Sequence, residues 1–255
     1  MAWDPQQYER FKAERAQPFR DLLALVRRAP GLRVVDLGCG TGETTRTLHD
    51  TLGARETLGL DSSAAMLEGA AQYATDGLRF EQGDIATFAP AVPFDLIFSN
   101  AALHWLPGHG ALLARLRDLL APHGQLAVQV PHNDAHPSHL AAQEAAGEPE
   151  FKRLLAGYLR RSPVLEPAQY SAWLHKLGFA EQHVRLQIHS HLLPSREEVV
   201  EWTKGTHLTD YQARLSPEAF ARFVERYRAL LLPQLEDARP FHFTFERLYL
   251  WARLG

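Results

Sequence analysis

Two aspartates and three glycines in the first quarter of the chain have the types and the spacing of a nucleoside-binding site. Asp36 stands two residues before the first of three alternating glycines, and Asp61 ends the next apolar segment. The glycines are Gly38, Gly40 and Gly42. Glycine lets the backbone turn and approach a ligand closely, the helix expected after the loop offers free N–H groups, and a carboxylate ending the second strand can accept both ribose hydroxyls. The pattern predicts a site for an adenosine-containing cofactor.

The charge around the glycines selects among such cofactors. The dinucleotide pattern is Gly-x-Gly-x-x-Gly, whereas here the third glycine comes one residue early and Glu43 follows it. Carboxylates at positions 36 and 43 would repel a pyrophosphate and attract an ammonium group. S-adenosyl-L-methionine carries an ammonium group and no phosphate, and the run from Asp36 to Gly42 resembles motif I of the class I methyltransferases that use it. The resemblance implies S-adenosyl-L-methionine as cofactor and S-adenosyl-L-homocysteine as product.

Strand-length apolar segments alternate with helical patterns in the first half of the chain. We expect strands at about 33–37, 56–60, 77–81, 94–98 and 124–130, with helices at about 42–53, 62–74 and 109–121 between them. Such alternation predicts a parallel sheet with right-handed crossovers, which binds ligands beyond the carboxyl ends of its strands. Two later strands, at about 181–191 and 241–252, complete an α/β, Rossmann-like, doubly wound sheet of seven mostly parallel strands, the last of them antiparallel.

The remaining segments predict helical additions to this core. We expect a single methyltransferase domain over residues 1–255, with its core at about 30–131 and in the two later strands. Helices at 5–28 are expected to break at Pro18. A helical cap is expected at about 132–178 and 194–238, because an insertion of some fifty residues between two strands is usually functional.

Composition bounds the class of protein and its partners. The formal net charge of −3 and the 45% hydrophobic content give no general attraction to nucleic acid or to anionic membranes. No apolar run approaches the length of a membrane span and no leader is evident, so a cytoplasmic location is the default expectation. One cysteine, Cys39, excludes a disulfide framework, and thirteen histidines without a His-Glu-x-x-His pattern do not predict a metal site. The oligomeric state stays open, and a monomer is compatible with the sequence.

Further residues at the same edge of the predicted sheet are candidates for the cofactor. Asp84 follows the third strand, and the resemblance implies that an acid there reaches the adenine amino group while Ile85 packs on the ring. It also implies that Met66, on the helix after the second strand, forms part of the adenine wall. The other candidates are Ser62 after Asp61, Asn100 at the end of the fourth strand, and Arg15 in the N-terminal helix.

Segments inside and outside the core are similar to the trans-aconitate 2-methyltransferase family over nearly the whole chain. They are residues 3–18, 95–107, 126–131, 193–202 and 245–253. The resemblance implies formation of a methyl ester on one carboxylate of trans-aconitate. A carboxylate is already ionised near neutral pH, so the reaction requires positioning in a water-poor pocket rather than a general base. We therefore expect no catalytic acid or base.

A small polycarboxylic acid must be held by cationic or N–H donors, with aromatic walls around it. The candidate substrate-binding residues are His104, Trp105, Arg196, Trp202, His207 and Tyr211. Three alternatives stay open: a methyltransferase for another carboxylate, such as the malonyl carrier-protein type, a cofactor-binding regulator without catalysis, and a nicotinamide oxidoreductase. The last is disfavoured by Asp36 and the glycine spacing.

Overall fold

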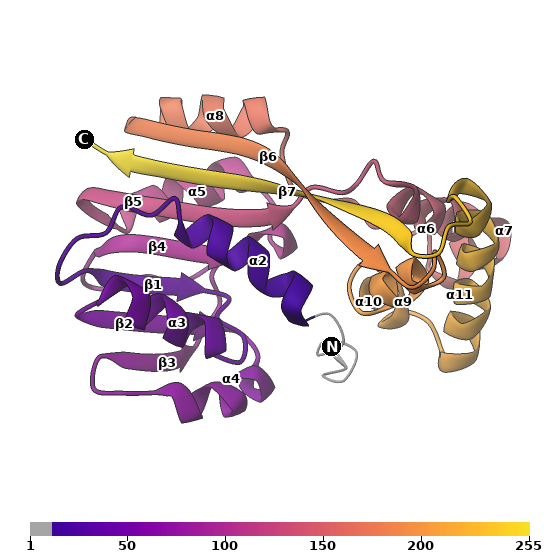
Figure 1. The fold of residues 1–255 in the computed structure, drawn as a ribbon, viewed down its shortest axis with the longest axis horizontal. Coiled ribbons are helices and arrows are strands. Elements are labelled where there is room, and N and C mark those ends of the chain that lie inside the picture. Colours follow the sequence, from indigo (N-terminus) through magenta and orange to yellow (C-terminus); the bar gives the residue numbers. More distant parts are fainter. Residues whose placement is uncertain (1–11) are drawn as a thin grey trace. The chain divides into compact units, whose positions relative to one another are not determined.

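The computed structural model describes residues 12–255, with side chains from Gln17 onward, and divides them into two compact units (Figure 1). The sheet unit contains Ala16–His132, Pro163–Gln187 and Arg247–Gly255. The helical unit contains Asn133–Ser162 and Ile188–Glu246. No helix in the described part of the chain is long and apolar enough to cross a membrane.

A seven-stranded sheet has the strand order β3-β2-β1-β4-β5-β7-β6. The strands are β1 (Arg33–Leu37), β2 (Glu56–Asp61), β3 (Leu78–Gln82), β4 (Phe94–Asn100), β5 (Leu120–Pro131), β6 (Phe179–Leu193) and β7 (Phe241–Leu254). Strands β1 to β5 pair in parallel and β7 pairs antiparallel with β5. The prediction of a mostly parallel, seven-stranded α/β sheet is confirmed. Strands β6 and β7 each contribute residues to both units.

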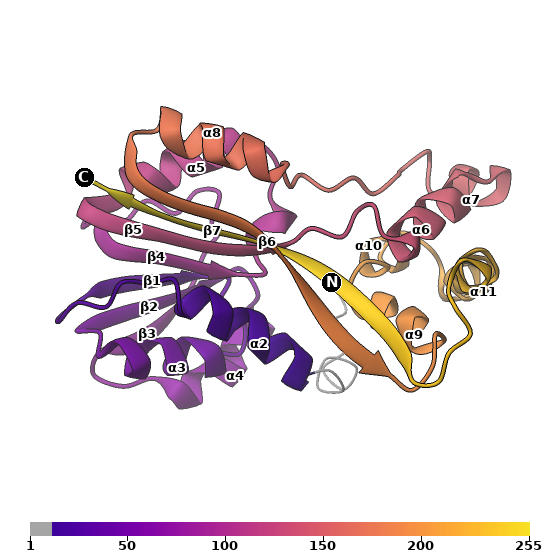
Figure 2. The same ribbon diagram turned by 45° about the horizontal axis from the view of Figure 1, so that its top comes forward.

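Helices cover both faces of the sheet, as Figures 1 and 2 show. Helices α2 (Lys12–Leu23) and α3 (Glu43–Leu52) bury Phe19, Leu22 and Leu48 against one face. Helices α5 (His109–Asp118) and α8 (Pro167–Lys176) bury Leu116 and Tyr170 against the other. Because both faces are covered, the central strands β1, β2 and β4 are buried at nearly every position. The short helix α4 (Ala64–Ala70) and the 3-10 turns η1 (Ala71–Tyr73) and η2 (Leu103–Trp105) lie in connections between strands.

Helix α2 does not break at Pro18, contrary to the sequence prediction. Pro18 lies inside the helix and is buried. Beside it, Phe19 lies edge-on to Phe98 of β4, with 5.5 Å between ring centroids. The packing of the helix therefore contributes more free energy than the hydrogen bond that the missing proline N–H costs. The part of the predicted N-terminal helices before Lys12 lies outside the described residues.

The helical unit contains α6 (Pro137–Gly147), α7 (Pro149–Leu154), α9 (Glu198–Lys204), α10 (Thr209–Gln212), α11 (Pro217–Leu231) and the turn η3 (Leu232–Gln234). Proline at the first helical position starts α6, α7 and α11, where its missing N–H has no intrahelical partner to lose. The expected cap at 132–178 extended too far along the chain. Residues from Pro163 onward belong to the sheet unit, because Tyr170 and Leu174 of α8 are buried in its core.

Candidate functional site

The glycine loop after β1 adopts a backbone that requires glycine at its three alternating positions. Gly38, Gly40 and Gly42 have φ values of 81°, 55° and 79°. The N–H groups of Gly38 and Cys39 donate to the carbonyl of Leu60 at 2.8 and 3.1 Å, which fixes the loop to the end of β2. A Cβ at Gly38 would lie 2.2 Å from the Cβ of Ala102, whereas one at Gly40 would meet no described atom within 4 Å. The loop is therefore packed behind Gly38 and open at Gly40.

Asp36 is buried in front of α3, with 3% of its surface exposed. Its Oδ2 accepts a hydrogen bond of 2.6 Å from the hydroxyl of Thr45. Burial raises the pKa of Asp36 to about 7, the Thr45 hydroxyl opposes the rise, and the charge of Asp61 adds to it. A cation arriving beside Asp36 would favour its ionised form, so this carboxyl is suited to an ammonium group.

Asp61 closes the loop from the end of β2. Its Oδ2 accepts the N–H of Gly40 at 2.9 Å and its Oδ1 accepts the N–H of Ser63 at 2.9 Å. Ser63 in turn caps α4 by accepting the N–H of Met66. Each carboxylate oxygen has two lone pairs, so one on each oxygen remains for a ligand hydroxyl. The same side chain thus orients the glycine loop and can accept both hydroxyls of a ribose.

Asn100 ends β4, two strands from β2 at the same edge of the sheet. Its Oδ1 is buried and has no hydrogen-bond partner among the described residues. Buried polar atoms are nearly always paired in native proteins, and an unpaired acceptor beside the loop fits a donor group of a ligand. Asp36, Asp61, the open space at Gly40 and Asn100 together fit the ammonium and ribose groups of S-adenosyl-L-methionine, and they fit a phosphate poorly.

The candidates for the adenine side lie around the ends of β2 and β3. Ser62 is exposed and Met66 is half-buried. Asp84 begins a turn, because its Oδ1 accepts the N–H of Ala86 at 2.7 Å. Arg115 of α5 holds the same turn by donating to the carbonyl of Ile85. Their contact with adenine stays a prediction. Arg15 lies in α2, but its side chain is outside the described part.

Cys39 lies in the loop without the features of a nucleophile. It is buried, and its burial together with the charges of Asp36 and Asp61 raises its pKa, which keeps the thiol protonated. Within residues 12–255, no group of three or more His, Cys, Asp or Glu side chains could hold a metal ion.

Two of the substrate candidates follow β4 in the sheet unit. His104 and Trp105 form the turn η2, with 4.7 Å between their ring centroids, and Trp105 is 45% exposed. The segment starts three residues after Asn100, so its position at the carboxyl edge of the sheet is compatible with contact to an acceptor.

The four substrate candidates of the helical unit serve that unit's own packing. Arg196 donates to the carbonyls of Leu232 and Leu235 and to Asp237, at 2.9 to 3.1 Å. Trp202 and Tyr211 are 2% and 0% exposed in the unit's core. These contacts show that the three residues take part in the packing of the unit, and their contact with an acceptor stays a prediction.

His207 is also buried, beside His139, with 4.0 Å between the ring centroids. Burial, His139 and Arg160 hold the pKa of His207 well below its usual range, so it is neutral. The guanidinium of Arg160 donates to the carbonyl of His207 at 3.0 Å and lies 3.7 Å from the carboxylate of Asp210. No sequence signal distinguishes it from the adjacent Arg161.

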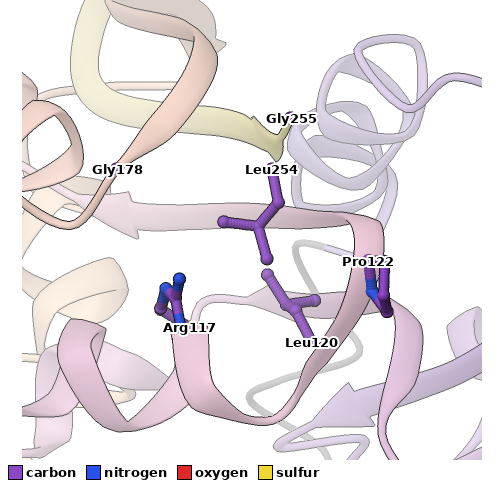
Figure 3. Close-up of a pocket in the computed structure, with 6 residues that line it drawn as sticks. All are labelled: Arg117, Leu120, Pro122, Gly178, Leu254 and Gly255. Atoms are coloured by element: carbon purple, nitrogen blue, oxygen red, sulfur yellow. The ribbon is translucent and has the colours of Figure 1, made fainter.

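A pocket of about 370 Å³ lies away from this site (Figure 3). Its lining residues are Arg117, Leu120, Pro122, Gly178, Leu254 and Gly255. Strand β5 begins at Leu120 and the antiparallel β7 ends at Leu254, so the pocket is at the amino edge of the parallel strands. Ligands of such sheets bind at the opposite edge, and the pocket is not part of the candidate site.

Comparison with known proteins agrees with this geometry. Residues 34–124 match the family model described as a methyltransferase domain. A trans-aconitate 2-methyltransferase of Deinococcus radiodurans is 44% identical over 99% of both chains, and one of Methylobacterium nodulans is 43% identical over 98% of both.

Among solved structures, the fold is similar to the YcgJ protein of Bacillus subtilis, with a TM-score of 0.61 and 15% identity over 94% of this chain and 98% of that one. It is also similar to phosphoethanolamine N-methyltransferase 2 of Haemonchus contortus in complex with S-adenosyl-L-methionine, with a TM-score of 0.54 and 18% identity over 94% of this chain and 53% of that one. These structures share the fold, and the full-length relatives share much of the sequence as well. The chain belongs to the trans-aconitate 2-methyltransferase family.

Proposed function

We propose that this protein transfers the methyl group of S-adenosyl-L-methionine to one carboxylate of trans-aconitate and so forms a methyl ester. The observation that carries the proposal is the carboxyl edge of the sheet unit. There, a buried carboxyl at Asp36, a ribose-accepting carboxylate at Asp61 and an unpaired acceptor at Asn100 surround an open glycine loop. Relatives named for this activity match the chain over its whole length.

Each residue of the site has a separate task in this proposal. Asp61 accepts the ribose hydroxyls, while Asp36 and Asn100 accept from the ammonium group. Asp84, Ile85, Met66 and Ser62 surround the adenosine. The cofactor, when bound, supplies a methyl group made electrophilic by a sulfonium sulfur.

The acceptor requires orientation more than activation. Its carboxylate is ionised at neutral pH and is already a nucleophile, so no side chain has to remove a proton. We propose that His104 and Trp105, which follow Asn100 along the chain, contact the acceptor from the sheet unit. Exclusion of water would strengthen the attraction between the anionic acceptor and the cationic donor.

Methyl transfer from labelled S-adenosyl-L-methionine to a panel of small di- and tricarboxylates tests the proposal. We expect turnover of trans-aconitate at a higher kcat/KM than of the other acids. Turnover of a different acid alone would contradict the acceptor while keeping the reaction. Tight binding of S-adenosyl-L-homocysteine without turnover of any acid would favour the cofactor-binding regulator. The cytoplasmic location and the absence of nucleic-acid and membrane partners stay predictions from composition.

A further inference from the structure

Two buried glutamines on β5 differ in how their amides are used. Gln125 and Gln129 lie four residues apart on one strand and therefore on the same face of the sheet, and both are at least 95% buried. The Gln125 amide is fully engaged. Its Oε1 accepts from the N–H of Arg27 at 2.8 Å and from the indole of Trp251 at 3.0 Å, and its Nε2 donates to the carbonyl of Arg27 at 2.9 Å.

Gln129 has no such partners. Its Nε2 and Oε1 are both buried and form no hydrogen bond within the part of the chain that the structure describes. An apolar side chain of the same shape would be more stable in an interior position of this kind, because an unpaired buried amide loses its hydrogen bonds to water and gains none. The position of Gln129 at the carboxyl end of β5 indicates what it is for. It is in register with Asn100 of β4, whose Oδ1 is also unpaired.

The side of Gln129 away from Asn100 carries positive charge. Gln129 is in register with Tyr249 of β7, and the guanidinium of Arg185 lies 5.2 Å from the Tyr249 ring centroid. The Nε of Arg185 is buried, and no described residue forms a hydrogen bond with it. Arg247, two residues before Tyr249 and on the same face, is 6% exposed.

One carboxylate faces these two cations from α2. Asp21 hydrogen bonds with the Tyr249 hydroxyl and accepts from Gln17 and Gln187 at 2.8 and 3.0 Å. Burial raises the pKa of Tyr249, so its hydroxyl stays neutral. The groups around Tyr249 thus include the guanidiniums of Arg185 and Arg247 and the carboxylate of Asp21.

We propose that Gln129, Arg185 and Arg247 form a carboxylate-binding subsite at the carboxyl edge of the sheet, next to the proposed methyl-donor site. The subsite rests on the proposed function, which brings two sources of carboxylate to this edge: the acceptor acid and the amino-acid end of the cofactor. Gln129 donates from Nε2 to a carboxylate oxygen, and the two guanidiniums compensate its charge.

The substitution Gln129→Met tests the subsite, with Gln125→Met as its matched control. Methionine keeps the length of the side chain and removes the amide. We expect Gln129→Met to melt at or above the temperature of the unsubstituted protein, because it removes an unpaired amide, whereas Gln125→Met should melt lower. Three ligands are compared in each variant. The KM for trans-aconitate is measured from initial rates. The affinities for S-adenosyl-L-homocysteine and for 5′-methylthioadenosine, which lacks the amino-acid end of the cofactor, are measured by calorimetry.

Each pattern of results has one meaning. A rise of at least tenfold in the KM for trans-aconitate, with unchanged affinity for S-adenosyl-L-homocysteine, assigns the subsite to the acceptor. A loss of at least tenfold for S-adenosyl-L-homocysteine but not for 5′-methylthioadenosine assigns it to the cofactor. If neither changes by more than twofold, the proposal is overturned and Gln129 only packs the core.

Two further arms keep the test independent of folding and of the proposed reaction. Should Gln129→Met not fold, Arg185→Met is measured in the same way, with the same expected changes and the same result overturning the proposal. Should the unsubstituted protein not turn over trans-aconitate, the proposed function fails. Calorimetry then tests the subsite by two affinities in each variant. One is the affinity for S-adenosyl-L-homocysteine, and the other is the affinity of the S-adenosyl-L-homocysteine complex for trans-aconitate.

Discussion

The candidate residues at the carboxyl edge of the sheet unit differ from those of the helical unit in the hydrogen bonds that their side chains make. At the carboxyl edge of the sheet unit, the Oδ1 of Asn100 and the amide of Gln129 are buried without partners in residues 12–255, and Asp36 is buried with a raised pKa. In the helical unit, the guanidinium of Arg196 and the hydroxyl of Tyr211 are hydrogen bonded within the unit, although the Nε of Arg196 and the Nε2 of His207 are also buried there without a partner among the described residues. Unsatisfied polar atoms are a cost that folding alone does not explain. Because Asn100 and Gln129 lie in register at the edge that carries the glycine loop, this edge has the features of a binding site, and residue type alone is a poor guide in the helical unit.

The largest effect is expected from Asp61→Ala. The substitution removes the acceptor for both ribose hydroxyls and releases the N–H groups of Gly40 and Ser63. Hydrogen bonds to a charged group contribute about 1.5–3 kcal/mol each, so we expect the affinity for S-adenosyl-L-homocysteine to fall by at least about 100-fold. Calorimetry measures it, with exposed Asp76→Ala as the control. Unchanged affinity in Asp61→Ala would mean that the ribose is not held here.

Smaller effects are expected from two glycine substitutions in the loop, one mainly on stability and the other mainly on cofactor affinity. Gly38→Ala forces a positive φ on alanine and brings its Cβ within 2.2 Å of Ala102, so it should lower the melting temperature strongly. Gly40→Ala meets only the backbone cost of about 1–2 kcal/mol, since its Cβ points into open space. If the cofactor fills that space, Gly40→Ala should weaken S-adenosyl-L-homocysteine by about tenfold or more while melting higher than Gly38→Ala. Equal losses of stability and unchanged affinity would argue that the open space is not the cofactor site.

Asp36→Asn should remove most of the pH dependence of cofactor binding, with its largest loss of affinity at high pH. With a pKa of about 7 in the free protein, Asp36 is mostly protonated below that pH and must lose its proton before it can pair with the ammonium group. Affinity for S-adenosyl-L-homocysteine should therefore fall as the pH drops from 8 to 6, and Asp36→Asn should flatten this dependence.

The same residue links stability to pH in the opposite direction. The folded pKa lies above the ordinary value of 3.8, so the protonated form is the stabilised one. The contribution of Asp36 is present below about pH 4 and is lost as the pH rises through 7. Asp36→Asn should thus melt higher than the unsubstituted protein at pH 8. A parallel pH dependence of melting in both proteins would contradict the raised pKa.

The sequence predicts the sheet unit better than the helical unit, for physical reasons. Gly38, Gly40 and Gly42 are predictable because a positive φ limits the choice of residue, and Asp36 and Asp61 because strand ends in a parallel sheet meet at one edge. Gln129 lies in the segment 126–131, which is similar to the family in sequence. Whether its amide finds a hydrogen-bond partner depends on the packing of three strands, so this property is visible only in the structure.

The helical unit has no such backbone rule. A buried Trp202 and a wall of a pocket have the same residue type, and only tertiary contacts distinguish them. Tertiary contacts also explain why the predicted break at Pro18 was wrong. The packing of the buried helix outweighs the lost hydrogen bond.

The smallest effect on the proposed chemistry is expected from Arg196→Gln, which tests the helical side of the comparison. Its guanidinium holds the carbonyls of Leu232 and Leu235, so the substitution should cost about 1–3 kcal/mol of stability. Exposed Arg153→Gln is the matched control and should leave the melting temperature unchanged. Both variants should bind S-adenosyl-L-homocysteine like the unsubstituted protein and keep its KM for trans-aconitate. A large rise in that KM, at full stability, would return Arg196 to the acceptor site and remove the contrast between the units.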